Sequence, residues 1–447
     1  MADDDSEDDT KTRVKADYVV IGGGIAGVSC AQTLRILTSE QENVSIVLIS
    51  ATEVVKTVTE LTHLTKLLSS FNVVEKNVEE WQEENQGVQL ITGVVLDIDK
   101  INKTVLVEKF GNIQYKKLCI CTGGSPKVLS VNDHVLGIRD TQSVIHFQDR
   151  LKDATRVMVV GNGGIATEIV YELDKVDVIW AVKDSSISSV FVDAGAGEFL
   201  VKKLVNNESG NSESKATKRM KYSVNKTGDN QSYQGSALGP DWHKGFSTKG
   251  KSDGKSVHIE YKVEIDEILS TEELKSRSLT ESLLFDNSDD KDWNIYIKLN
   301  NGKIFGCDFV ISATGVTPAG DKFKHVVEVD DEGGIVVDEN MRTSDPDIYA
   351  AGDVCTAGWT HSYHWFQMRL WTQARQMGMM VAKMMIADME GEHIQQDFCF
   401  EMFAHVTKFF DYKVVLLGLY NGQKLDNQYE VLLRVTPGVE YVKVGGL

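Results

Sequence analysis

Short apolar runs recur along the chain, and most of them end at a glycine or at a small polar residue. Two of these runs, at residues 19–21 and 158–160, lead into glycine-rich turns, and a helical pattern follows each turn. An apolar run without polar alternation is typical of a strand that is buried on both faces, as in a parallel sheet covered by helices. The pattern therefore predicts two units of strand, glycine turn and helix in an α/β protein.

The remaining apolar runs predict further elements. We expect strands at 44–49, 118–121, 156–160, 176–182, 309–313 and 347–351. Residues 368–385 are rich in Met, Ala and Gln, which is the composition of a helix. After residue 398 the chain becomes β-rich, with strands expected at 413–417, 430–434 and 441–444.

Each glycine turn has the spacing of a dinucleotide-binding fingerprint. The first contains Gly22, Gly24, Ile25, Ala26 and Gly27, and the second contains Gly161, Gly163, Gly164, Ile165 and Ala166. The first glycine makes the turn, the second lets the backbone approach a pyrophosphate, and the third small residue lets the helix pack on the strand. The pyrophosphate then lies at the N–H groups of the helix amino end. Two fingerprints predict two bound dinucleotides, whose commonest joint use is electron transfer.

Composition and charge narrow the function class. The net charge of −19 argues against a nucleic-acid-binding surface over the whole protein. No run of 18 apolar residues occurs, so we expect no transmembrane helix. The first nine residues carry six acids, which predicts a disordered acidic tail over 1–14 and no signal peptide. Six cysteines without a CxxC pair indicate a reducing compartment.

Residues 206–256 interrupt the pattern. The segment is polar and lysine-rich, with nine Lys and Arg against five Asp and Glu, and it contains almost no aliphatic residues. Such a segment buries too little surface to offset its ordering entropy, so most of it is predicted to be a disordered insertion. Trp242 is unusual within it, and we favour a hydrophobic latch over a partner-docking motif.

Five motifs occur in a fixed order: the first fingerprint, Cys-Thr-Gly-Gly at 121–124, the second fingerprint, Ala-Thr-Gly-Val-Thr-Pro at 313–318, and Tyr-Ala-Ala-Gly-Asp-Val at 349–354. In this order the chain resembles the two-dinucleotide-binding flavoproteins of the pyridine nucleotide-disulfide oxidoreductase superfamily. The resemblance implies an α/β fold with two Rossmann-like domains, for FAD and NAD(P), and a truncated β-rich C-terminal interface domain. The implied ranges are 15–142 and 316–390 for FAD, 143–315 for NAD(P), and 391–447 for the interface domain.

The resemblance also assigns residues to the FAD site. Gly352 and Asp353 match the family's second FAD motif, in which the aspartate holds the ribityl or pyrophosphate side; the alternative is a plain strand-end turn. Ser50 stands where the family has an acid for the adenosine ribose, and as a neutral group it would be a weaker partner. Lys56 lies in the region of the family's lysine near flavin N5 and could equally contact an FAD phosphate or solvent. Further motif residues assigned to cofactor binding are Thr122, Gly123, Thr314 and Gly315.

The nicotinamide site is less fully specified. Val182 stands where an acid would bind the 2′-hydroxyl of NADH, and Lys183 follows it. Lys183 would meet the 2′-phosphate of NADPH or remain a solvated loop cation, so the choice between NADH and NADPH stays open. By resemblance, Glu168 is the catalytic residue beside the nicotinamide and the flavin. The alternative is a charge that complements the helix amino end.

The family's redox-active dithiol is missing from the sequence. No cysteine lies between Cys30 and Cys119, and Cys119 and Cys121 share one face of an expected strand, which favours buried packing. We therefore expect electrons to leave the flavin directly. His361 and His364 are three residues apart without a third ligand of suitable spacing, so no metal site is expected.

These observations predict an FAD-dependent NAD(P)H oxidoreductase without a dithiol, which resemblance places in the oxidative stress response of the cytoplasm and nucleus. One alternative, implied by resemblance to one branch of the family, is a guard protein that binds both cofactors and protects a client such as a tRNA ligase complex. Another is a diaphorase or oxidase acting on quinone, oxygen or peroxide. The sequence does not indicate the electron acceptor or the oligomeric state.

Overall fold

A computed structural model describes residues 12–64, 69–138, 140–206, 247–282, 284, 292–425 and 430–446. It divides the chain into two compact units. The first unit contains the described parts of Met1–Ser125 and Thr317–Val406. The second contains the described parts of Pro126–Lys226, Trp242–Val316 and Thr407–Leu447. The chain crosses between the units within β9 (Gly124–Pro126), β18 (Val316–Pro318) and β22 (Ala404–Phe409).

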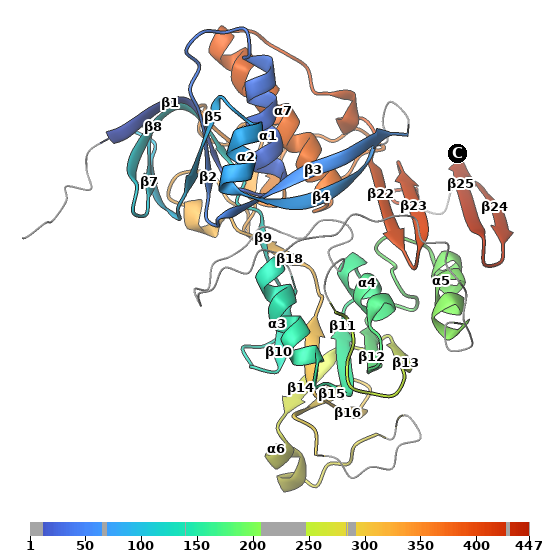
Figure 1. The fold of residues 1–447 in the computed structure, drawn as a ribbon. Helices are drawn as coiled ribbons and strands as arrows, with labels where there is room; N and C mark the ends of the chain where they lie inside the picture. The colour runs from blue at the N-terminus through green and yellow to red at the C-terminus, as the bar shows by residue number, and fades with distance from the viewer. Residues whose placement is uncertain are drawn as a thin grey trace, which may run out of the picture. The chain divides into compact units, whose positions relative to one another are not determined.

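A mostly parallel sheet forms the centre of the first unit (Figure 1). Its parallel strands are β5 (Val88–Thr92), β2 (Ile46–Ser50), β1 (Thr12–Ile21), β8 (Gly111–Ile120) and β20 (Ile348–Ala350). The antiparallel strands β6 (Val95–Asp99) and β7 (Thr104–Val107) extend it. Every residue of β2 is buried, as expected for an apolar run inside a parallel sheet. The parallel order brings the carboxyl ends of β1 and β2, and the turns that follow them, to the same edge.

Helices α1 (Ile25–Leu37) and α7 (Trp371–Glu390) lie side by side in this unit (Figure 1). They approach closely because Gly378 has no side chain: a Cβ there would lie 2.2 Å from the carbonyl oxygen of Ala26. An antiparallel hairpin, β3 (Val54–His63) and β4 (Ser69–Asn77), follows the first strand–helix–strand unit. The smaller elements of the first unit are α2 (Val78–Glu84), β19 (Ile335–Val337), β21 (Cys355–Ala357) and the 3₁₀ turns η1 (Asp321–Phe323) and η2 (Phe398–Phe400).

The second unit is built on a second parallel sheet, with strand order β10-β17-β11-β12-β13. These strands are β10 (Val135–Gly137), β17 (Phe309–Ser312), β11 (Arg156–Val160), β12 (Asp177–Val182) and β13 (Val257–Tyr261). Its helices are α3 (Thr141–Leu151), α4 (Gly164–Glu172), α5 (Ala194–Asn206) and α6 (Thr271–Ser276). A separate antiparallel sheet joins β14 (Ile265–Leu269), β15 (Ile295–Leu299) and β16 (Ile304–Cys307). Because β10 pairs with β17, the residues after Ser125 belong to this unit, whereas the sequence analysis assigned residues up to 142 to the FAD domain.

The C-terminal strands after Thr407 also belong to the second unit. They are β23 (Tyr412–Leu417), β24 (Glu430–Thr436) and β25 (Glu440–Gly446). The Tyr441 hydroxyl donates to Asp193 at 2.8 Å, and Tyr171 of α4 donates to Asp411 at 2.7 Å. These contacts tie the C-terminal segment to the helices of the second sheet.

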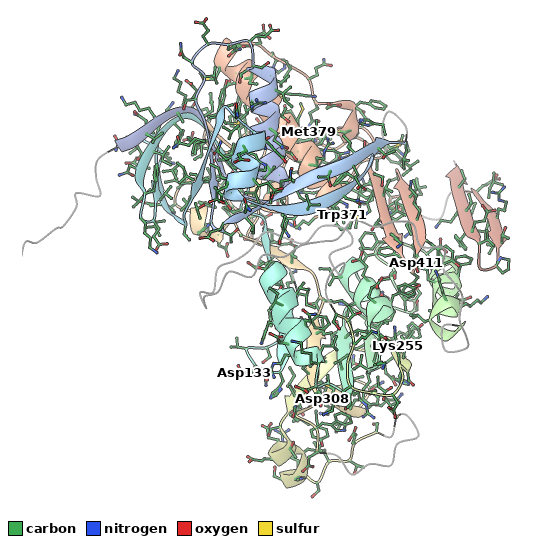
Figure 2. All side chains as sticks on the ribbon, viewed as in Figure 1. Asp133, Lys255, Asp308, Trp371, Met379 and Asp411 are labelled. Atoms are coloured by element: carbon green, nitrogen blue, oxygen red, sulfur yellow. The ribbon has the colours of Figure 1, made fainter. Side chains whose placement is uncertain are left out.

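Most of the expected elements are confirmed within one to five residues at their ends, including both units of strand, glycine turn and helix. The insertion prediction is wrong for residues 247–256, because they are built into the second unit. Lys255 donates to the carbonyls of Val170 (2.7 Å) and Tyr171 (2.9 Å) in the last turn of α4, and Figure 2 labels it there. Burial lowers its pKa to about 8. Residues 207–246, with Trp242, lie outside the described residues.

Candidate active site

The first fingerprint forms a turn that only glycine can make. Gly22 has a φ of +125°, and a Cβ built on it would lie 2.2 Å from the carbonyl oxygen of Cys121. A Cβ on Gly27 would lie 2.0 Å from the carbonyl oxygen of Gly22. The first and third glycines therefore have the steric roles that the fingerprint predicts: the tight turn and the close packing of helix on strand.

The two helices that follow the fingerprints begin without a capping side chain. Gly24 is the N-cap of α1 and Gly163 is the N-cap of α4, and neither first turn contains an acidic residue. Four other helices have an N-cap side chain that accepts a first-turn N–H: Asn77 for α2, Asp140 for α3, Asp193 for α5 and Ser270 for α6. Helix α7 also begins without a capping side chain, but its N-cap is Leu370 and not the glycine of a fingerprint. Uncapped N–H groups at the positive end of a helix can bind a pyrophosphate. The combination of a glycine N-cap with free first-turn N–H groups fits two dinucleotides at α1 and α4.

The second FAD motif lies at the amino end of α1. Gly352 has a φ of +81°, and a Cβ on it would lie 2.8 Å from the Cβ of Ala26 and 3.6 Å from that of Ala374 in α7. Asp353 follows directly, and its carbonyl accepts a hydrogen bond from Arg369 at 3.2 Å. The structure thus brings together the motif residues near 22–27 and 352–353, which are far apart in the sequence.

Thr122 and Gly123 follow the end of β8 after Cys121, at the same edge of the sheet. The carbonyl of Gly123 accepts from Ala319 at 2.9 Å, and Gly123 has a φ of +68°. Cys121, which precedes them, donates its N–H to Ile21 at 2.7 Å. This segment is held against the end of β1 and the start of the fingerprint.

Ser50 and Lys56 both contact the first fingerprint. The Ser50 hydroxyl is buried, accepts from the Thr52 N–H at 3.3 Å, and lies 2.4 Å from where a Cβ on Gly23 would be. The Lys56 N–H donates to the carbonyl of Gly23 at 2.8 Å. The Lys56 ammonium is buried and forms an ion pair with Glu75, directly opposite it in the β3–β4 ladder. Glu75 was not identified from the sequence.

A small cluster of apolar side chains lies beside the amino ends of α1 and α7. Ile25, Phe71 and Val73 form a buried cluster separate from the main core, and Val58, Trp371 and Ala374 pack on it. Figure 2 labels Trp371 at the start of α7. This cluster offers flat, apolar surfaces suited to an aromatic ring system. Of this set, Ile25 belongs to the first fingerprint.

His405 fixes the start of α7. Its Nδ1 lies 2.9 Å from the Thr372 hydroxyl, and its ring lies 5.3 Å from that of Trp371. Burial lowers the pKa of His405 to about 3, so the imidazole is neutral at physiological pH. It acts here as a hydrogen-bonding and packing group.

The second fingerprint repeats the geometry of the first. Gly161 has a φ of +135°, and a Cβ on it would lie 2.2 Å from the carbonyl oxygen of Ala313. Gly163 has extended backbone, and no atom of the described residues beyond its chain neighbours lies within 4 Å of a built Cβ, which leaves room for a ligand. Ala166 is fully buried, as expected for the small residue that packs helix on strand. Gly164 and Ile165 form the first turn of α4, and a Cβ on Gly164 would contact Phe191 and Phe409.

Asn162, between the two glycines, ties this fingerprint to the loop after β12. Its amide donates to Asp184 at 2.8 Å, to the carbonyl of Ser186 at 2.9 Å and to Ser189 at 2.8 Å. Hydrogen bonds from Ser189 and Asn162 lower the pKa of Asp184, so this carboxylate is ionised. Asp184 was not identified from the sequence, although it stands only two residues beyond the expected position at Val182.

Lys183 and Glu168 occupy different environments. Lys183 is 74% exposed and pairs with Glu264 at 3.0 Å, which matches a solvated loop cation. Glu168 lies half-buried on the second turn of α4 rather than the first.

Thr314 and Gly315, of the motif at 313–318, follow the end of β17. The Thr314 hydroxyl donates to the carbonyl of Lys127 at 3.1 Å, and Gly315 has a φ of +104°.

Buried thiols gather beside the first fingerprint. The sulfur atoms of Cys119 and Cys121 lie 3.4 Å apart, and Cys30 of α1 interacts with Cys119. Burial raises the pKa of Cys119 and of Cys30, which keeps both as thiols. The expectation that Cys119 and Cys121 are buried is confirmed.

Replacing Cys119 and Cys121 together by serine is expected to leave the rate of flavin reduction by NAD(P)H within about twofold of wild type. The buried substitutions should instead lower the free energy of unfolding by about 1 kcal/mol or more. Stopped-flow reduction and a urea titration measure the two effects, with Cys399→Ser as a control outside the cluster. A large loss of flavin reduction in a folded double variant would make the thiols part of the electron path.

No three His, Cys, Asp or Glu side chains of the described residues gather as metal ligands would. Within that same part of the chain, no helix is both long and apolar enough to cross a membrane.

Two uncapped, glycine-opened helices on two parallel sheets define a two-dinucleotide flavoprotein reductase. Comparison with known families agrees: residues 16–219 and 261–378 match the family "Pyridine nucleotide-disulphide oxidoreductase", and the chain belongs to that family. Its cofactors are FAD and NAD(P)H, and it is an oxidoreductase. The chain is 46% identical over 445 residues to the pyridine nucleotide-disulfide oxidoreductase domain-containing protein 1 of Rattus norvegicus, covering 96% of this chain and 88% of that protein.

Solved structures share the fold. A ferredoxin reductase from Rhodopseudomonas palustris has a TM-score of 0.62 at 18% identity, covering 94% of this chain and 85% of its own. A water-forming NADH oxidase from Lactobacillus brevis has a TM-score of 0.59 at 18% identity, covering 97% and 83%. Both are similar in architecture to this chain.

Proposed function

We propose that this protein passes a hydride from NAD(P)H to FAD without a dithiol relay and then passes electrons directly from the flavin to an acceptor. The observation that carries the proposal is the pair of uncapped helices α1 and α4, each opened by a glycine turn that excludes a side chain. When bound, the nicotinamide donates hydride and the flavin accepts it. Burial raises the pKa of the Cys119 thiol and so disfavours the thiolate that a dithiol relay requires, which supports the proposal.

In this proposal the side chains and backbone of the protein bind the two cofactors and orient their rings. The N–H groups at the start of α1 and α4 hold the two pyrophosphates, while the cluster around Phe71 and Trp371 excludes water from the flavin ring. The Lys56 backbone N–H holds the carbonyl of Gly23, and the buried Lys56–Glu75 pair fixes this part of the hairpin beside the glycine turn. In this proposal Glu168 orients the nicotinamide carboxamide. The test is anaerobic reduction by NADH and by NADPH, where absence of flavin bleaching by either nucleotide would contradict it.

The identity of the electron acceptor distinguishes the proposed reductase from a guard protein and from an oxidase or diaphorase. The similar solved structures include a ferredoxin reductase and a water-forming oxidase, so the shared fold serves several acceptors. A guard role for a client such as a tRNA ligase complex, in the cytoplasm and nucleus under oxidative stress, remains a second proposal. Reoxidation of the reduced protein by oxygen, quinone or peroxide distinguishes them, because a guard protein would keep its flavin reduced for long times.

We expect NADH to be preferred over NADPH because of Asp184. Its Oδ2 atom is held by Asn162 and Ser189, whereas no described residue hydrogen-bonds Oδ1. An ionised carboxylate beside the fingerprint can accept from the ribose 2′-hydroxyl and repels a 2′-phosphate. Asp184→Asn should therefore shift the NADH-to-NADPH ratio of kcat/KM toward NADPH by about tenfold or more, an energy of about 1.4 kcal/mol.

Lys183→Gln is the matched control for Asp184→Asn. It changes the neighbouring side chain, which is exposed and paired with Glu264, and should leave the ratio within about twofold. If Lys183→Gln shifts the preference toward NADH and Asp184→Asn does not shift it, Lys183 is the residue that recognises the 2′ position.

A further inference from the structure

Arg375 lies on the second turn of α7, beside the apolar cluster at the amino ends of α1 and α7. Its guanidinium carbon is 5.8 Å from the centre of the Phe71 ring, within the range of a cation–π contact. The side chain is half-buried, and desolvation by burial lowers its pKa. Arg375 is therefore a cation placed partly out of water.

No described residue forms a hydrogen bond or an ion pair with Arg375. Arg342 provides the comparison within the same unit: it also lies 5.8 Å from an aromatic ring, that of Tyr349, but it is paired with Asp388 at 2.8 Å. A partly desolvated charge without a counter-charge is costly, and protein interiors normally supply a partner. Among the described residues no counter-charge meets Arg375, and a bound ligand would supply the negative group.

The surroundings of Arg375 suit the flat ring of a bound cofactor better than its phosphate groups. Its aromatic neighbour Phe71 belongs to the cluster that includes Ile25 and Trp371, and Ala374 on the same helix lies beside Gly352. The phosphate-binding features, Gly22 and the uncapped start of α1, are backbone groups at the glycine turn. Flat heterocycles are bound by apolar and aromatic side chains with a few polar groups. Hydride addition at flavin N5 leaves one negative charge on the ring, spread over N1 and the C2 carbonyl.

We propose that Arg375 is the positioning cation that stabilises this negative charge on the flavin ring of bound FAD, and so raises its reduction potential. The inference rests on the proposed function, because it requires FAD at the first fingerprint. Arg375 sets how readily the ring takes electrons and contributes little to the retention of FAD, which the glycine turn and α1 provide.

The test uses the FAD-loaded full chain and two readouts that do not depend on turnover. Sulfite adds reversibly to N5 of oxidised flavin and leaves the same negative charge on the ring, so its affinity reports a nearby cation. Arg375→Gln should weaken sulfite binding by about tenfold or more and lower the midpoint potential of the flavin. Arg375→Lys keeps the charge and should restore most of both values, which a purely structural role for the side chain would not predict.

Arg342→Gln is the matched control and should leave sulfite affinity within about twofold of wild type. Unchanged sulfite affinity and potential in a fully flavinated Arg375→Gln variant would overturn the proposal and leave the proposed function intact. Loss of FAD from Arg375→Gln, with retention by Arg375→Lys, would overturn it in favour of a phosphate contact. Absence of FAD from the wild-type protein would instead contradict the proposed function itself.

Discussion

Replacing Gly163 by valine is expected to abolish nicotinamide binding while leaving the fold and the FAD content intact. Gly163 has extended backbone, which valine adopts readily, and a Cβ added there meets no atom within 4 Å in the described part of the chain beyond its own neighbours. The open space is where the second fingerprint predicts the pyrophosphate of NAD(P)H. The branched side chain would fill that path and raise the dissociation constant of NADH at least about a hundredfold, about 2.8 kcal/mol.

Isothermal titration measures NADH binding, flavin absorbance measures the FAD content, and thermal unfolding measures the stability of the variant. As an N-cap, valine costs the helix α4 about 1 kcal/mol or less relative to glycine, so unfolding should shift only slightly. Gly254→Val is the matched control, since Gly254 lies in the same unit and also has open space around its Cβ position. Undiminished NADH binding by a folded Gly163→Val protein would remove the second fingerprint from the cofactor site.

Replacing Gly22 by valine should remove FAD from the protein and destabilise the first unit. Two costs combine at this position: a φ of +125°, which branched residues avoid, and a Cβ 2.2 Å from the Cys121 carbonyl oxygen. Relief of the clash must move β8 or the glycine turn, and either movement takes the N–H groups of α1 away from the pyrophosphate. We expect a colourless protein with a free energy of unfolding lowered by about 3 kcal/mol or more.

Gly391→Val separates backbone strain from the clash. Gly391 has a φ of +71° at the end of α7 but open space around its Cβ position, so this variant should lose stability yet keep its FAD. Absorbance spectra and released flavin after denaturation quantify the cofactor in both proteins. Full flavin content with a normal spectrum in Gly22→Val would show that the first fingerprint does not bind FAD.

The local patterns of the sequence predicted the framework well. The strands β1, β11 and β17 and the glycine turns follow from apolar runs and steric rules that act over a few residues. The same rules could not predict the β3–β4 hairpin, because its strands mix Lys, Thr and Glu with valine. These two segments form strands because they pair with each other and are partly buried beside the fingerprint, and both are tertiary effects.

The missed site residues are joined by contacts that the sequence does not record. Lys56 pairs with Glu75 because the register of the hairpin places them opposite each other. Arg375 contacts the ring of Phe71 although the two residues are about 300 positions apart in the sequence. Asp184 is different, since an acid so close to the end of β12 was visible in the sequence. It was missed because the expected position was fixed at Val182 rather than extended along the loop.

Anaerobic titration of the FAD-loaded protein with NADH is the most direct test of the central claim. A flavin that is the sole two-electron acceptor in the chain should be fully reduced by one equivalent of NADH per FAD, with no lag. A redox-active cysteine pair would consume a second equivalent before full reduction. Complete bleaching at one equivalent is the predicted result; a second equivalent, or no bleaching at all, would contradict a dithiol-free FAD and NAD(P)H oxidoreductase.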